Sequence, residues 1–79
     1  MPAAKIRQFT VSLTIGRTEF ERLYRGQASN VLARDVHGRT VSFPARSLRP
    51  FLDHGGVRGT FVVEVDADNR LLGVRRRGD

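Results

Sequence analysis

The sequence predicts an α+β fold. We expect a small, strongly bent and barrel-like antiparallel sheet of about five strands, with one short helix packed across it. Three observations predict it. Apolar and polar residues alternate in several stretches, a short amphipathic helix pattern follows the first of them, and glycines interrupt two strand patterns. A glycine inside a strand is typical of a bulge or bend. The expected order is β-α-β-β-turn-β-β, with a sheet that curls towards an SH3-like or OB-like barrel.

The chain has 79 residues and no cysteine. This length predicts a single domain close to the lower limit for one hydrophobic core. We expect residues 1–5 to be a disordered lead, residues 6–76 to form the domain and residues 77–79 to be a tail. Without disulfides, the core must come from Phe, Val, Leu and Ile side chains or be completed by self-association.

Residues 6–15 predict the first strand, because apolar residues occupy every second position from Phe9 to Ile15. A helix over residues 19–25 is expected next. Thr18 and Glu21 have the spacing of a capping box, and Gly26 is placed for a left-handed C-cap.

Residues 28–43 predict a hairpin with a turn at 35–38, in which Gly38 supplies a positive φ. Pro44 lacks an N–H and should end the ladder. Residues 45–52 then predict one helical or 3-10 turn that places Leu48 against the core, with Pro50 bounding any helix.

Residues 53–56 predict a loop, and residues 57–65 form the longest alternating run of the chain. Its pattern places Val62 on the outer face. A turn at 66–69 and a last strand over residues 70–76 complete a second hairpin. Gly59 and Gly73 are the glycines expected to mark bulges or bends.

The polar residues argue against catalysis. His54 beside Asp53 and His37 near Asp35 do not have the spacing of a metal-ligand cluster, and the serines lack a recognisable His and acid partner. The glycines at 55, 56 and 59 resemble a phosphate-binding loop, but no Lys-Ser/Thr follows, so a tight turn explains them better. We therefore predict no enzyme activity, no metal and no cofactor.

The charge is strongly basic, with 14 Lys and Arg against 8 Asp and Glu, a net charge of +6. Such a balance favours polyanions, although it can also reflect basic solubility or an arginine-rich proteome. Six arginines are candidates for nucleic-acid binding: Arg39, Arg46, Arg49, Arg58, Arg75 and Arg76. If they converge, they form a basic stripe that contacts phosphates, and the scarcity of exposed aromatic residues predicts little sequence preference.

The alternative function is a protein-interaction or self-assembling module. Val62 and either Leu71 or Leu72 are candidates for an apolar patch on the last hairpin, which would suit a homodimer. The chain shows neither an apolar run of membrane-spanning length nor a signal peptide, so we expect a cytoplasmic protein without membrane contact.

The segment Phe43-Pro-Ala-Arg-Ser-Leu-Arg-Pro-Phe51, followed by the glycine-rich stretch 54–59, resembles a family of short bacterial proteins known only as a domain of unknown function. The resemblance covers nearly the whole chain and implies stand-alone, single-domain, cytoplasmic members. It implies no activity and no functional residues. The cyclic-dinucleotide-binding PilZ barrels are a poorer comparison, because Arg46 and Arg49 lie three apart rather than four and the second PilZ motif is missing.

Overall fold

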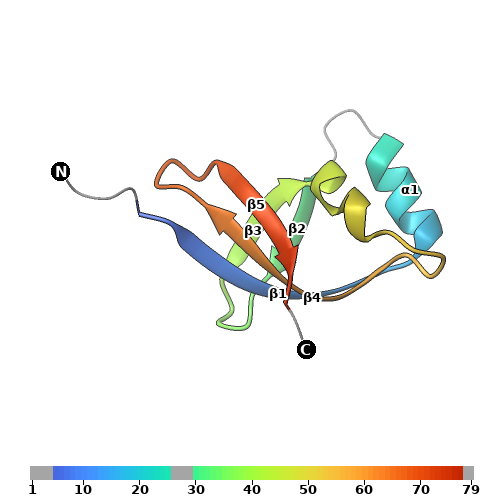
Figure 1. Cartoon of the computed structure of the whole chain (residues 1–79), viewed down its shortest axis with the longest axis horizontal. Helices are drawn as coiled ribbons and strands as arrows, with labels where there is room; N and C mark the ends of the chain where they lie inside the picture. Colours follow the sequence, from blue (N-terminus) through green and yellow to red (C-terminus); the bar gives the residue numbers. More distant parts are fainter. Residues whose placement is uncertain (1–4, 26–29, 78–79) are drawn as a thin grey trace.

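The computed structural model describes residues 5–25 and 30–77. Within these residues the chain forms five strands, one α-helix and one 3-10 helix (Figure 1). In chain order they are β1 (Arg7–Ile15), α1 (Arg17–Arg25), β2 (Asn30–Arg34), β3 (Thr40–Pro44), η1 (Ala45–Phe51), β4 (Val57–Val65) and β5 (Leu71–Arg76). The predicted α+β class and the predicted order of elements are confirmed.

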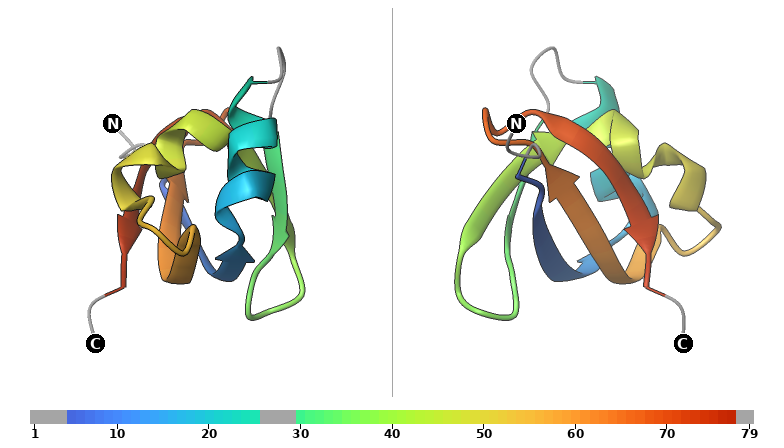
Figure 2. Two further views of the ribbon diagram at one scale, coloured as in Figure 1. Left: turned by 90° about the vertical axis from the view of Figure 1, so that its right-hand side faces the viewer. Right: turned by 60° about the vertical axis from the view of Figure 1, so that its left-hand side comes forward.

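The strands form two antiparallel sheets rather than one. The first has the order β1-β4-β5, and the second pairs β2 with β3. The prediction of a single, strongly bent, barrel-like sheet of five strands is therefore wrong. The two views in Figure 2 show the β2–β3 hairpin standing beside the three-stranded sheet, with the helices at one end.

The two sheets have little strand pairing between them. On one side, the pairing of the β2–β3 hairpin with β1 consists, among the described residues, of an isolated bridge between Val11 and Asp35, next to a 3.0 Å hydrogen bond from the Val36 N–H to the Thr10 carbonyl. On the other side, Pro44 ends β3 and η1 follows at once. This helix contacts both β3 and β5, and these two strands do not pair.

The alternating patterns identified the core correctly. The register of β1 and β4 sets Phe9 opposite Val63 and Val11 opposite Phe61, on one face of the sheet. Side chains from β2, β3, α1 and η1 cover that face. The largest fully buried side chains are Phe20, Phe43, Phe61 and Leu48.

Helix α1 begins two residues earlier than predicted. The Gly16 carbonyl accepts the first helical hydrogen bond, from the Phe20 N–H at 2.8 Å, so Gly16 is the N-cap residue. Thr18 lies inside the first turn, and the predicted capping box is wrong. The predicted C-cap at Gly26 and the predicted start of the hairpin at residues 28 and 29 lie outside the described residues.

The short turn predicted over residues 45–52 is confirmed as η1, and Leu48 is fully buried beneath it. The prediction that Pro50 bounds this helix is wrong, because Pro50 lies within it. The 3-10 conformation continues to Phe51 and ends at Leu52, whose extended backbone donates its N–H to the Arg49 carbonyl.

The last hairpin contains the predicted irregularity at Gly73. Glu64 pairs with Gly73, but Val65 pairs with Leu71, which leaves Leu72 as an extra residue in β5. Such a bulge shifts the side-chain phase of a strand by one residue. Gly59, the other predicted bend, has φ 134°, a region that L side chains rarely adopt.

Candidate nucleic-acid interface

A groove lies where the two sheets fail to meet, between β3 and the turn that leads into β5. It consists of two adjoining hollows of about 510 and 800 Å³, which share Ser42 and Asn69 in their walls. We call it the β3–β5 groove. Its polar lining includes Arg7, Arg39, Thr40, Ser42, Asn69, Arg70, Arg46, Ser47, Asn30 and Tyr24. Among the described residues, no Asp or Glu lines either hollow.

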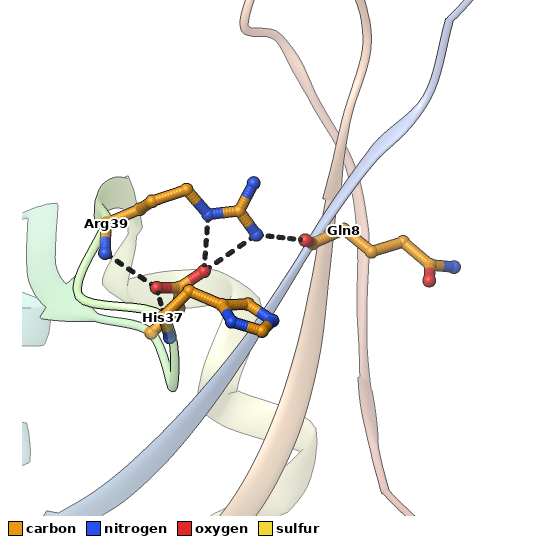
Figure 3. Close-up of polar contacts among 4 residues, drawn as sticks. Gln8, His37 and Arg39 are labelled. Atoms are coloured by element: carbon orange, nitrogen blue, oxygen red, sulfur yellow. Dashed lines mark hydrogen bonds and ion pairs between the residues drawn. The ribbon is translucent and has the colours of Figure 1, made fainter.

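Arg39 is held in the groove by a buried carboxylate. Asp35 is only 6% exposed, and its two oxygens accept hydrogen bonds from the backbone N–H groups of His37 (3.0 Å) and Arg39 (2.7 Å) and from the Arg39 Nε (2.8 Å). The Arg39 Nη2 lies 2.8 Å from the same carboxylate and donates to the Gln8 carbonyl at 3.0 Å (Figure 3). The side chain thus ties the β2–β3 turn to β1.

The Asp35 carboxylate is ionised at neutral pH. Burial raises the pKa of Asp35, but the hydrogen bonds from Arg39 and His37 and the Arg39 charge outweigh it and bring the pKa below its ordinary 3.8. The pair as a whole is neutral. However, the guanidinium also lies 4.5 Å from the centre of the Phe9 ring, so it remains at the groove wall.

Arg7, Arg46 and Arg70 contribute the other cations of the groove. Arg7 opens β1, Arg46 lies at the start of η1, and Arg70 precedes β5. All three are exposed, and within residues 5–25 and 30–77 none has a side-chain hydrogen bond or ion pair. Their charges are therefore available to a ligand.

Arg49 lies just outside the groove, against the helix α1. Its Nη1 donates a 2.8 Å hydrogen bond to the Tyr24 hydroxyl, and its guanidinium lies 5.0 Å from the centre of the Tyr24 ring. Since Tyr24 lines the same hollow as Arg46, the structure brings Arg46 and Arg49 close to one another, around Tyr24.

Arg76 has a structural role. The bulge at Leu72 turns it to the core side of β5, where it lies 5.0 Å from the centre of the Phe61 ring and donates a 2.7 Å hydrogen bond to the Arg58 carbonyl. A Cβ at Gly59 would stand 2.6 Å from the Arg76 Nη1. Gly59 is therefore the residue that makes room for this guanidinium.

Arg58 and Arg75 lie elsewhere, on the face of the three-stranded sheet that is turned away from the core. Arg58 is paired with Thr14 and Arg75 with Val62. Of the six predicted arginines, the structure thus places Arg39 and Arg46 in one groove, Arg49 beside it, two on the outer sheet face and Arg76 against the core. The sequence analysis missed Arg7 and Arg70.

The predicted apolar patch does not form one exposed surface. Val62 has the predicted outward phase but is only 9% exposed, since it lies on the central strand between Thr10 and Arg75. Leu71 packs against the core, and Leu72 in the bulge is 53% exposed.

The glycine-rich loop after η1 is a tight turn. The Gly56 N–H donates to the Asp53 carbonyl at 3.1 Å, the Asp53 N–H donates to the Gly56 carbonyl at 3.0 Å, and the Gly55 N–H donates to the Asp53 carboxylate at 2.8 Å. These N–H groups are already bonded within the loop, so they do not form a phosphate cradle. In the described part of the chain, no three His, Asp or Glu side chains come together as a metal site would need.

Comparison with known proteins assigns the chain to a family. Residues 7–77 match the model of the family described as "Protein of unknown function (DUF2835)". The chain belongs to this family. Searches of curated proteins and of solved structures found no match to the chain. Among the described residues, neither helix is long and apolar enough to span a membrane.

Proposed function

We propose that this member of the DUF2835 family is a non-enzymatic module that binds the backbone of nucleic acids, with little sequence preference, in the β3–β5 groove. The observation that carries the proposal is the charge of this groove. Four arginines, Arg7, Arg39, Arg46 and Arg70, line it, and no carboxylate among the described residues does. Guanidinium groups bind phosphate through paired hydrogen bonds.

The polar residues between these arginines support the same ligand. Ser42 and Asn69 stand where the two hollows join, and both can donate a hydrogen bond to a phosphate or sugar oxygen. Contacts of this kind position a nucleic acid without reading its bases.

The aromatic side chains support the lack of sequence preference. The Phe9 ring lies beneath the Arg39 guanidinium, and the Tyr24 ring contacts Phe20, with ring centres 6.0 Å apart, and Arg49. Phe9 and Phe43 are buried, so among the described residues that line the groove Tyr24, 41% exposed, is the one aromatic ring open to a base. Stacking on a ring is tolerant of sequence, because every base has a π-face. The binding energy would then come from the phosphates.

The test is a binding titration by fluorescence anisotropy with labelled oligonucleotides of mixed sequence. For phosphate contacts by the three unpaired arginines, Arg7, Arg46 and Arg70, the slope of log K against log salt should be about −2.1 for a single strand, so that affinity falls about 20-fold between 50 and 200 mM salt. The double variant Arg46→Ala/Arg70→Ala should reduce the magnitude of this slope by about 1.4.

The control variant removes two positive charges that lie outside the groove. Arg22 on α1 and Arg34 on β2 are exposed and do not line the groove. The double variant Arg22→Ala/Arg34→Ala should leave the slope almost unchanged. An equal loss in both double variants would mean that only net charge matters, and no binding at low salt would refute the proposal.

The variant Arg58→Ala/Arg75→Ala tests the other predicted arginines. They lie on the outer face of the three-stranded sheet. Removing them therefore distinguishes binding on that face from binding in the groove. If this variant loses more affinity than Arg46→Ala/Arg70→Ala, the interface is the sheet face and the groove assignment is wrong.

A further inference from the structure

We infer that the β3–β5 groove takes a single strand of nucleic acid rather than a duplex. This inference rests on the proposed function and names its ligand class. Three features carry it: the distribution of the arginines along both hollows, the junction of the hollows at Ser42 and Asn69, and the unpaired edge of β3.

The arginines stand in two pairs, one in each hollow. In the first hollow Arg39 follows the β2–β3 turn, and Arg7 comes from β1. In the second, Arg46 comes from η1 and Arg70 from the turn before β5. The Arg7 and Arg39 guanidinium groups both lie over the Phe9 ring of β1, 6.0 and 4.5 Å from its centre, so the first pair sits together at one end of the groove. A ligand that contacts all four arginines must therefore extend through both hollows.

The two hollows adjoin at Ser42 of β3 and Asn69 of the β4–β5 turn, because both residues line both hollows. A single strand is thin and flexible enough to follow the groove from one hollow into the other, and proteins that bind single strands do so in basic grooves that follow the backbone. A duplex is a stiff cylinder with its phosphates on the outside, so it would touch only the rim.

The edge of β3 adds neutral donors along one wall. The Asp35 N–H donates to the Arg39 carbonyl at 2.7 Å, so this pair has its backbone groups turned towards one another. Backbone direction alternates along an antiparallel strand, and therefore Val41 and Phe43 face β2 while Thr40 and Ser42 turn their N–H and C=O groups to the open edge. Within the described residues β3 has no second strand neighbour.

These edge groups are spaced to meet successive units of an extended chain. Thr40 and Ser42 are two residues apart, about 7 Å along the strand. The edge ends at Pro44, whose carbonyl already accepts a hydrogen bond from the Ser47 hydroxyl. An acidic peptide could also add to such an edge, but two open residues are short for strand pairing, so the edge favours a ligand that does not pair as a strand.

The experiment compares three ligands by fluorescence anisotropy at low salt: a labelled single strand of about 15 nucleotides, the same sequence as a duplex, and polyglutamate of similar length. We expect the single strand to bind the full chain at least about tenfold more tightly than either of the others. The variant Arg46→Ala/Arg70→Ala should remove this preference, and Arg22→Ala/Arg34→Ala should keep it.

The variant Ser42→Pro tests the strand edge without changing the charge. It removes an N–H that faces the groove, and proline is tolerated on an edge strand where its missing N–H is not used by the ladder. Affinity for the single strand should fall at least about tenfold, as expected for one lost hydrogen bond to a charged group, with affinity for the duplex unchanged. Ser42→Ala, which keeps the N–H, is the matched control, and circular dichroism checks that both variants are folded.

The outcomes separate the inference from the proposed function. Equal or tighter binding of the duplex overturns the inference but leaves nucleic-acid binding standing. Tighter binding of polyglutamate overturns both, in favour of an acidic protein partner. No binding of any oligonucleotide refutes the proposed function itself. Unchanged single-strand binding by a folded Ser42→Pro variant also overturns the inference, because the β3 edge would then have no part in it.

Discussion

Gly56 is the position at which a single methyl group should do most harm to the fold. Its φ is 107°, and a Cβ placed there would overlap the carbonyl oxygen of Ile15 and stand 2.8 Å from the amide nitrogen of Arg17. Both are backbone atoms at the junction of β1 and α1. They cannot turn aside as a flexible side chain would.

The expected cost of Gly56→Ala has two parts. Holding an L-residue in this backbone conformation costs about 1–3 kcal/mol. Forcing the overlapping backbone apart costs about 1–3 kcal/mol more, as in an overpacked core. A total of about 2–6 kcal/mol should lower the midpoint of thermal unfolding by at least about 8 °C in a domain of this size.

Two other glycines separate these contributions. Gly38 has a φ of 83°, but an added Cβ would meet nothing within 4 Å, so Gly38→Ala should cost only the backbone part, about 1 kcal/mol. Gly73 does not have a positive φ of this kind, and its Cβ would also meet nothing within 4 Å. Gly73→Ala is therefore the matched control and should be close to neutral.

The assay is thermal and urea unfolding followed by far-ultraviolet circular dichroism on the three variants and the wild type. The reasoning predicts the order Gly73→Ala, Gly38→Ala, Gly56→Ala from least to most destabilised. If Gly56→Ala unfolds within a few degrees of Gly73→Ala, the close approach of the glycine-rich loop to the β1–α1 junction is not part of the fold in solution, and the argument fails.

Three further predictions concern the charged contacts and the core. Because the folded-state pKa of Asp35 is lowered, its ionisation stabilises the fold fully above the ordinary pKa of 3.8, and this contribution is lost as the pH falls through the folded-state value. At pH 7, Asp35→Asn should therefore unfold at a lower temperature than the wild type. As the pH falls below 3.8, the unfolding temperature of the variant should decrease less than that of the wild type, and parallel pH profiles of the two proteins would contradict this. Arg76→Met should cost about 1 kcal/mol in urea unfolding through the lost hydrogen bond and cation–π contacts, yet leave oligonucleotide affinity almost unchanged. Leu48→Ala should cost about 2–5 kcal/mol because Leu48 is fully buried, whereas Leu72→Ala, at an exposed position, should change urea unfolding by no more than about 0.5 kcal/mol.

Much of the fold was predictable because the strand signal is local. The alternation over residues 57–65 gave both ends of β4 correctly, and Pro44 marked the end of β3. The separation into two sheets was not predictable. It depends on the spacing of β3 and β5, which are distant from one another in the sequence. The turn at η1 was predicted, but its contacts with both β3 and β5 were not.

The candidate site was harder to predict for the same reason. Arg7 and Arg70 lie 63 positions apart in the sequence and line adjoining hollows of one groove only because the β1–β4–β5 register brings the start of β1 to the β4–β5 turn. Arg76 was misjudged for a different reason. A simple alternation cannot anticipate that the extra residue at Leu72 reverses the phase of β5 and turns Arg76 towards the core.

The open edge of β3 and the charge of the groove have a common origin. Had β3 paired with β5, the N–H and C=O groups of Thr40 and Ser42 would have been used by the ladder, and the hollows between the strands would have been closed. Because β3 and β5 do not pair, the chain keeps a free strand edge at a groove that is also lined by Arg7 and Arg70. Free edges are commonly protected against aggregation by being short and by nearby charge, and β3 is both. The short length of β3 and the positive charge near it disfavour pairing with another β-strand. The same two features suit the edge to the phosphate backbone of a nucleic acid.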